Sequence, residues 1–332
     1  MSAGDAGFGR PHASSQQYEG ITMIDHLIAG RQRDIGGFCV RRVLPSPKRR
    51  LVGPFIFFDE MGPSQFAPGD ALEVRAHPHI GLATLTYLFD GRIVHRDTTP
   101  VEQTISPGAV NLMIAGGGIV HSERSHGDDV PEGHGLHGLQ LWLALPKSHE
   151  QGPASFHHTP ETELPKIEGR TMRGRVVMGE AYGLEAASTF PWPALFVELR
   201  IDAGTRCPLP EALECGVFVV SGRLRIGDTE VPAGTMATVD AGPLDVEALE
   251  NSQIAVVGGD PMDGPRAIEW NFVASDPALI EAAKADWRAA PGNGFSGRFP
   301  MPAGEHDHIP LPGEAATDRQ GAPEPVKDCP TS

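Results

Sequence analysis

Four residues in the first half of the chain carry side chains that bind divalent metals, and their spacing groups them in two pairs. His77 and His79 are separated by one residue, and His121 and Glu123 repeat this i, i+2 spacing. Alternate residues of a β-strand point to the same face, so each pair can project from one strand into a common interior. Two neighbouring strands would then offer two ligands each.

The predicted donor set of three neutral imidazoles and one carboxylate suits one divalent metal ion. Such donors accept Fe(II), Mn(II), Co(II), Ni(II), Cu(II) or Zn(II), and the four cysteines include no Cys-x-x-Cys pair that would favour a thiolate zinc site. An octahedral ion with four protein ligands keeps two adjacent positions open for a chelating substrate, water or dioxygen. The alternative is a set of unconnected surface or core histidines, which is the usual interpretation of a single His-x-His.

The chain that must position these ligands has an all-β pattern. Glycine (40 residues) and proline (31 residues) divide it into short apolar segments, which is typical of strands joined by turns. Such segments occupy residues 82–89, 109–115, 138–145, 194–201 and 215–222. Many short strands favour barrels or sandwiches, and 332 residues exceed one small barrel. A single helix is predicted over 276–290, with Pro277 in its first turn.

The distribution of histidines separates the two predicted halves. None of the 14 histidines lies between Thr159 and Glu305, so imidazole chemistry belongs to the first half. The predicted division is a flexible N-terminus (1–22), a metal-binding barrel (23–149), a connection (150–169), a barrel without metal ligands that carries the helix (170–299) and an extended tail (300–332).

Charge and hydropathy exclude several classes of partner. The formal net charge of −16 disfavours a phosphate backbone, so direct nucleic-acid binding is not expected. The one basic cluster consists of Arg41, Arg42, Lys48, Arg49 and Arg50, and we interpret it as a solvated loop. The apolar runs are too short to cross a bilayer. The first twenty residues lack the pattern of an export signal, which predicts a cytoplasmic protein.

Five segments resemble the pirin family of the cupin superfamily, across nearly the whole chain apart from its ends. They are FIFFDEMGP (55–63), HPHIGLATLTYLFDG (77–91), SPGAVNLMIAGGGIVHSERS (106–125), HGLQLWLALP (137–146) and GGDPMDGPRAIEWNFVAS (258–275). General cupins place a glutamate ligand shortly after the first histidine pair, where this chain has Leu82, Ala83 and Thr84. Pirin-like proteins take it from the second motif, at Glu123 here. The resemblance implies two cupin barrels, with iron in the first.

The resemblance implies two functions, because some pirin-like proteins open flavonols such as quercetin with dioxygen and others are regulatory cofactors of transcription factors. For the enzyme, we expect Fe(II), an aromatic substrate and dioxygen, with Glu123 as both ligand and catalytic base. The alternative is a non-catalytic regulatory protein whose partner binding depends on the redox state of the iron. A non-oxidative cupin using Zn(II) or Mn(II) is a third interpretation.

Overall fold

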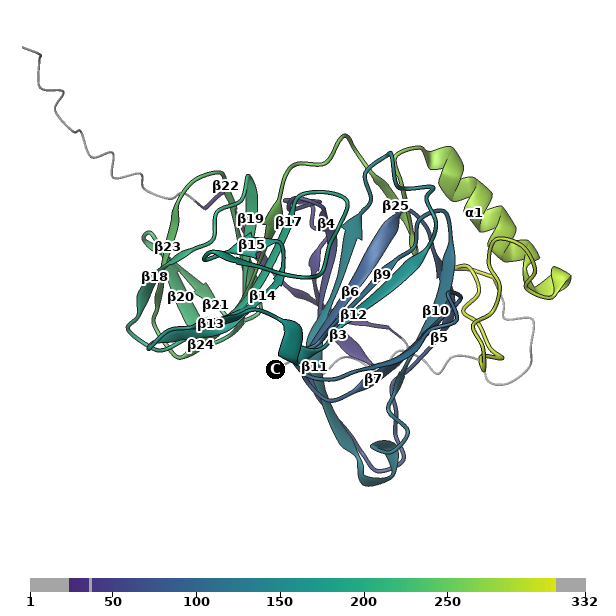
Figure 1. The fold of residues 1–332 in the computed structure, drawn as a ribbon, viewed down its shortest axis with the longest axis horizontal. Helices are drawn as coiled ribbons and strands as arrows, with labels where there is room; N and C mark the ends of the chain where they lie inside the picture. Colours follow the sequence, from purple (N-terminus) through teal and green to yellow (C-terminus); the bar gives the residue numbers. More distant parts are fainter. Residues whose placement is uncertain (1–23, 36–37, 315–332) are drawn as a thin grey trace, which may run out of the picture.

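The computed structural model describes residues 24–35 and 38–314, and these form two β-barrels that lie side by side (Figure 1). Each barrel combines a seven-stranded and a four-stranded antiparallel sheet. The described part also contains one α-helix, near its end. The predicted all-β class with a short C-terminal helix is therefore confirmed. The predicted N-terminus, 1–22, and residues 315–332 of the predicted tail lie outside the described residues.

The strands of the first barrel form the following sheets. The seven-stranded sheet has the order β12 (Ser155–Thr159), β9 (Val110–Ile114), β6 (Leu82–Asp90), β11 (His134–Ala144), β4 (Phe55–Phe66), β3 (Cys39–Leu44) and β2 (Arg31–Asp34). The four-stranded sheet has the order β5 (Glu73–His79), β10 (Ile119–Ser125), β7 (Ile93–Asp97) and β8 (Glu102–Ile105).

The second barrel repeats this plan. Its seven-stranded sheet has the order β1 (His26–Ala29), β22 (Thr235–Asp240), β19 (Glu214–Ser221), β24 (Ser252–Gly259), β17 (Ala194–Ile201), β14 (Met172–Met178) and β13 (Lys166–Glu168). Its four-stranded sheet has the order β18 (Arg206–Leu209), β23 (Leu244–Ala248), β20 (Arg223–Ile226) and β21 (Thr229–Pro232). The remaining elements are β15 (Glu180–Ala181), β16 (Leu184–Glu185), β25 (Ala267–Glu269), β26 (Phe272–Ala274), α1 (Pro277–Ala289) and the short helices η1 (Val130–Glu132), η2 (Glu161–Glu163) and η3 (Pro291–Asn293).

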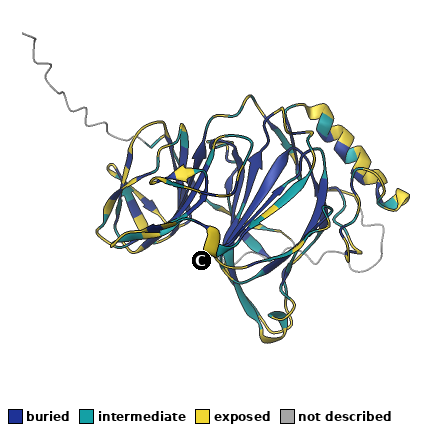
Figure 2. Ribbon diagram, in the orientation of Figure 1, coloured by how far each residue is buried: buried dark blue, intermediate teal, exposed yellow. Residues whose placement is uncertain are grey.

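The two seven-stranded sheets pack against each other, and Figure 2 shows the buried strands between the barrels. Successive side chains of β17 point to opposite faces of its sheet, so this strand contributes both to the contact between the barrels and to the core of the second barrel. Phe196 is fully buried in the cluster between the barrels, whereas Val197 and Leu199 belong to the core of the second barrel. Phe196 lies 5.5 Å from Tyr87 of the first barrel, ring centre to ring centre. Burying an apolar side chain of this size contributes about 1.5–3 kcal/mol, so each barrel stabilises the other.

The interior of the second barrel is filled with apolar side chains. Val197, Val217, Val219, Leu224 and Ile254 all belong to one buried cluster. An apolar core packed at normal density has neither polar donors nor space for an ion. This agrees with the absence of histidines from that part of the sequence.

Strand pairing crosses the predicted domain boundaries. β1, which the prediction placed in the first barrel, pairs with β22 of the second, with His26 opposite Thr238. The predicted connection, 150–169, instead supplies β12 to the first barrel and β13 to the second. Both cases have one physical reason, because an open sheet edge pairs with any segment that satisfies its backbone N–H and C=O groups.

The helix α1 packs on the first barrel, although the prediction grouped it with the second. Asp276 caps it by accepting a hydrogen bond from the backbone N–H of Ala278, and Pro277 begins it, so its bounds agree with the predicted 276–290. Its buried residues include Ile280 and Trp287, which share an apolar cluster with Val120 of β10. The apolar face of the helix thus covers the outside of the strands that carry the predicted ligands.

The described part of the tail, 300–314, crosses the same sheet. The N–H of Ile309 donates to the carbonyl oxygen of Ala76 at 2.8 Å. The buried carboxylate of Glu305 accepts hydrogen bonds from Ser122 Oγ at 2.8 Å and Arg124 Nε at 3.0 Å. These contacts hold the segment against β5 and β10, so this part of the predicted tail is packed as well as extended.

The basic cluster is largely neutralised by ion pairs. Arg42 makes two hydrogen bonds to Asp59, at 2.9 and 2.8 Å, and Arg41 contacts Glu60. Arg49 lies 3.0 Å from Glu214 of the second barrel. The loop interpretation is wrong for Arg41 and Arg42, which lie in β3. Among the described residues, no helix is long and apolar enough to span a bilayer.

Candidate metal centre

The antiparallel pairing of β5 and β10 brings the predicted ligand strands together. His77 lies directly opposite His121 in the register, and His79 lies opposite Ile119. Pro78, between the two histidines, has no N–H to donate, and β5 is an edge strand of its sheet, where proline is tolerated. A β-bulge between His121 and Glu123 shifts the register at the second pair, which bends the strand locally.

The hydrogen bonds of the ring nitrogens orient the first histidine pair. Nδ1 of His77 lies 2.8 Å from the carbonyl oxygen of Arg75, and Nδ1 of His79 lies 2.9 Å from that of Asn271. A carbonyl oxygen only accepts, so these contacts assign the proton of each neutral ring to Nδ1. Each Nε2 therefore keeps a free lone pair.

These lone pairs point towards the third histidine. Nε2 of His79 lies 3.0 Å from Nε2 of His121, and one ligand atom from each of His77, His79 and His121 lies within 4.8 Å of the others. Two nitrogens about 2.1 Å from one ion and 3.0 Å apart subtend roughly 90°, the angle between neighbouring positions of an octahedron. The three imidazoles therefore fit a divalent cation.

Burial keeps the three rings neutral. Burial lowers the pKa of His77 to about 4, and it lowers the pKa of His79 and His121 well below the ordinary value, with nearby histidine charges adding to the effect in each. A neutral imidazole is the form that binds a metal. The site is therefore in the metal-binding state at neutral pH.

Glu123 lies in a second group, with His121 and His95, whose ligand atoms are also within 4.8 Å of one another. Its Oε1 accepts a hydrogen bond of 2.9 Å from Gln140 Nε2. Burial raises the pKa of Glu123, while His95 and Gln140 act in the opposite direction. The structure thus joins the two groups through His121, and the four-ligand set with Glu123 stays a prediction.

His95 and Asp97 are site residues that the sequence reasoning missed. Nε2 of His95 lies 2.9 Å from Asp97 Oδ2, and its Nδ1 lies 3.4 Å from Nδ1 of His121. Both residues lie on β7, opposite Glu123 and His121 of β10. The signal was present, because His95 and Asp97 repeat the i, i+2 spacing of the other pairs.

A cavity of about 420 Å³ opens onto His77, His79 and Glu123. Its wall includes Phe57 and Trp142, whose rings stack 4.1 Å apart at 13°. The guanidinium of Arg42 lies 4.3 Å from the centre of the Phe57 ring. The volume and the mainly apolar lining are those of a small-molecule site, and flat aromatic walls favour a planar ligand.

Comparison with known proteins agrees with this geometry. The family model Pirin matches residues 37–143, and the model of the pirin C-terminal cupin domain matches 196–293. A pirin-like protein of Caulobacter vibrioides is 43% identical over 296 residues, which cover 87% of this chain and 100% of that protein. The chain belongs to the pirin family.

Two further relatives are similar to this member of the pirin family over most of its length. Pirin of Rattus norvegicus is 29% identical over 281 residues, covering 82% of this chain and 93% of that protein. A crystal structure of quercetin 2,3-dioxygenase from Acinetobacter baumannii has a TM-score of 0.78 and 30% identity, covering 90% of this chain and 98% of that one. The two barrels are therefore the two cupin domains of the pirin family.

Proposed function

We propose that the first barrel holds one divalent ion, Fe(II), through His77, His79, His121 and Glu123, and that it opens flavonol-type substrates with dioxygen. The observation that carries the proposal is that one ring nitrogen from each of the three histidines lies within 4.8 Å of the others, beside the 420 Å³ cavity that His77 and His79 line. Similarity to a quercetin 2,3-dioxygenase supports it. When bound, the ion would supply Lewis acidity that lowers the pKa of a coordinated hydroxyl.

The protein side chains would orient the substrate and take its proton. A planar flavonol would lie in the 420 Å³ cavity, which is lined by Phe57 and Trp142 and opens onto His77 and His79. Glu123 is the proposed base, because Gln140 occupies only its Oε1 and leaves Oε2 without a hydrogen bond from that residue. We expect Glu123→Gln to lower turnover by about 10²- to 10⁴-fold. A Glu123→Gln protein that keeps its metal and full turnover would remove this role.

Anaerobic purification with metal analysis, followed by oxygen uptake with quercetin, tests the proposal. We expect one iron per chain and oxygen uptake that depends on quercetin. His121→Ala removes a proposed ligand and is expected to lose both, whereas the matched control His157→Ala, an exposed residue of β12, keeps both. Iron without oxygen uptake, together with a partner recovered only by one redox state, would favour the regulatory alternative.

A further inference from the structure

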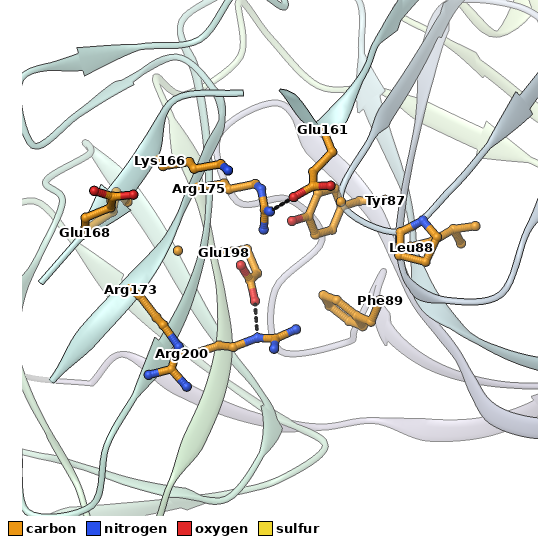
Figure 3. A pocket seen from close by; sticks show the side chains of 14 residues that line it. Tyr87, Leu88, Phe89, Glu161, Lys166, Glu168, Arg173, Arg175, Glu198 and Arg200 are labelled. Atoms are coloured by element: carbon orange, nitrogen blue, oxygen red, sulfur yellow. Dashed lines mark hydrogen bonds and ion pairs between the residues drawn. The ribbon is translucent and has the colours of Figure 1, made fainter. Parts of the chain in front are cut away.

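A second cavity, of about 430 Å³, lies between the two barrels and shares no lining residue with the metal cavity. Tyr87 and Phe89, aromatic residues of β6 in the first barrel, line one side. Charged residues of the second barrel line the other, and Figure 3 shows both sides together. The inter-barrel cavity lies next to the contact of Tyr87 with Phe196, where the interface is apolar.

Cations outnumber carboxylates in the inter-barrel cavity, although the whole chain has a net charge of −16. The lining cations are Lys166, Arg173, Arg175 and Arg200, and the acids are Glu161, Glu168 and Glu198. Two of the acids are engaged. Glu161 contacts Arg175, and the buried Glu198 accepts hydrogen bonds from Gln253 Nε2 at 2.8 Å and Arg200 Nε at 3.3 Å.

The strand register places two arginines directly opposite each other. Arg173 of β14 pairs with Arg200 of β17, and their side chains lie beside one another in Figure 3. Like charges at directly opposite positions of a sheet repel each other. Glu168 lies opposite Arg173 on β13 but forms no ion pair with it among the described residues, and the partner of Arg173 is the exposed Asp202, at 3.4 Å.

A further donor is unsatisfied at the same place. Nε of Arg175 is buried and has no hydrogen-bond partner among the described residues. A buried unpaired donor is unfavourable. An anion beside Arg173 and Arg200 would offset the repulsion between them, and guanidinium groups bind carboxylate and phosphate oxygens with matched geometry.

We propose that the inter-barrel cavity binds a small oxyanion, a carboxylate or phosphate group attached to an apolar or aromatic body. Arg173 and Arg200 hold the oxyanion, and the body lies against Phe89. The site is independent of the proposed metal chemistry, because no residue lines both cavities.

Calorimetric titration of the full-length, metal-loaded protein with phenyl phosphate, benzoate and inorganic phosphate tests the proposal. We expect saturable binding of phenyl phosphate or benzoate, with inorganic phosphate weaker. The tighter of the two aromatic anions identifies the oxyanion. No saturable binding of either at millimolar concentration, or equal binding of inorganic phosphate, would overturn the assignment.

Three variants localise the binding. Arg173→Gln is expected to weaken it at least about tenfold without lowering Tm, because it relieves the repulsion with Arg200. Arg206→Gln, an exposed arginine of β18 paired with Glu247 outside the cavity, is the matched control and leaves affinity unchanged. His121→Ala also leaves it unchanged, which excludes the metal as the anion site. Unchanged affinity in Arg173→Gln, or lost affinity in His121→Ala, refutes the proposal.

Discussion

Changing Asp97 to asparagine is predicted to weaken metal binding by inverting the proton positions of two histidines. Hydrogen bonds from His95 and Thr99 outweigh the effect of burial and hold the pKa of Asp97 below its ordinary value, so it is an anion. His95 Nε2 therefore donates to Asp97, and its Nδ1 accepts from Nδ1 of His121. That leaves the Nε2 lone pair of His121 facing His79, as a metal ligand requires.

The asparagine cannot preserve this arrangement. Oδ1 of Asp97 accepts from both the N–H and the hydroxyl of Thr99, at 2.7 and 2.6 Å. In Asp97→Asn the amide oxygen must stay at this position, so the NH₂ group faces His95 Nε2 and donates to it. His95 then carries its proton on Nδ1 and donates to His121, which places the proton of His121 on Nε2.

We expect the affinity for Fe(II) or Zn(II) to fall by about 10- to 100-fold, the usual effect of losing a partner behind a metal-bound histidine, which equals about 1.4–2.8 kcal/mol. Competition with a chromophoric chelator measures the affinity, and ¹⁵N NMR of the imidazoles reports the tautomers. Asp128→Asn, at an exposed acid, is the control. Wild-type affinity in Asp97→Asn, or an unchanged His121 tautomer, would refute this reasoning.

Three other changes test different parts of the structure. Phe196→Ala opens a cavity in the inter-barrel cluster and should lower the free energy of unfolding by about 3–5 kcal/mol, as measured by urea denaturation; a cost below about 1 kcal/mol would contradict mutual stabilisation of the barrels. Trp142→Ala removes the ring that stacks on Phe57 in the cavity wall and should raise KM for quercetin up to about tenfold, with the metal content unchanged. An unchanged KM would show that the substrate does not contact this wall. Burial alone would raise the pKa of Glu305, but hydrogen bonds from Arg124 and Ser122 hold this pKa below its ordinary value of 4.5. The ionised carboxylate therefore stabilises the fold in full above about pH 4.5, and this stabilisation is lost as pH falls through the folded-state pKa. Glu305→Gln should therefore be less stable than wild type at pH 7, and the difference should shrink in acid; a difference that grows in acid would contradict the ion pair.

The part of the site predictable from sequence is the part that depends on local geometry. The i, i+2 spacing of His77 and His79 places both on one strand face, because alternation is a property of any strand. The histidine-free stretch between Thr159 and Glu305 likewise predicts a barrel without imidazole ligands. A prediction of this kind needs no knowledge of which strands are neighbours.

The missed features depend on contacts between distant segments. His95 and Asp97 repeat the i, i+2 spacing of the other pairs, but they join the site only because β7 pairs with β10, and spacing alone does not show which strands are neighbours. Glu305 reaches Arg124 across 181 residues. The two groups of candidate ligands share His121, and the bulge in β10 between His121 and Glu123 depends on tertiary pairing that spacing alone does not encode.

The pairing of β1 with β22 has a consequence for how the molecule is made. His26 leaves the ribosome long before Thr238, its partner 212 positions later. Until then the earliest segment has no edge to join, and the second barrel lacks its outermost strand. Because contacts between such distant segments form slowly, we expect a nascent chain halted before β22 to leave His26–Ala29 open to protease.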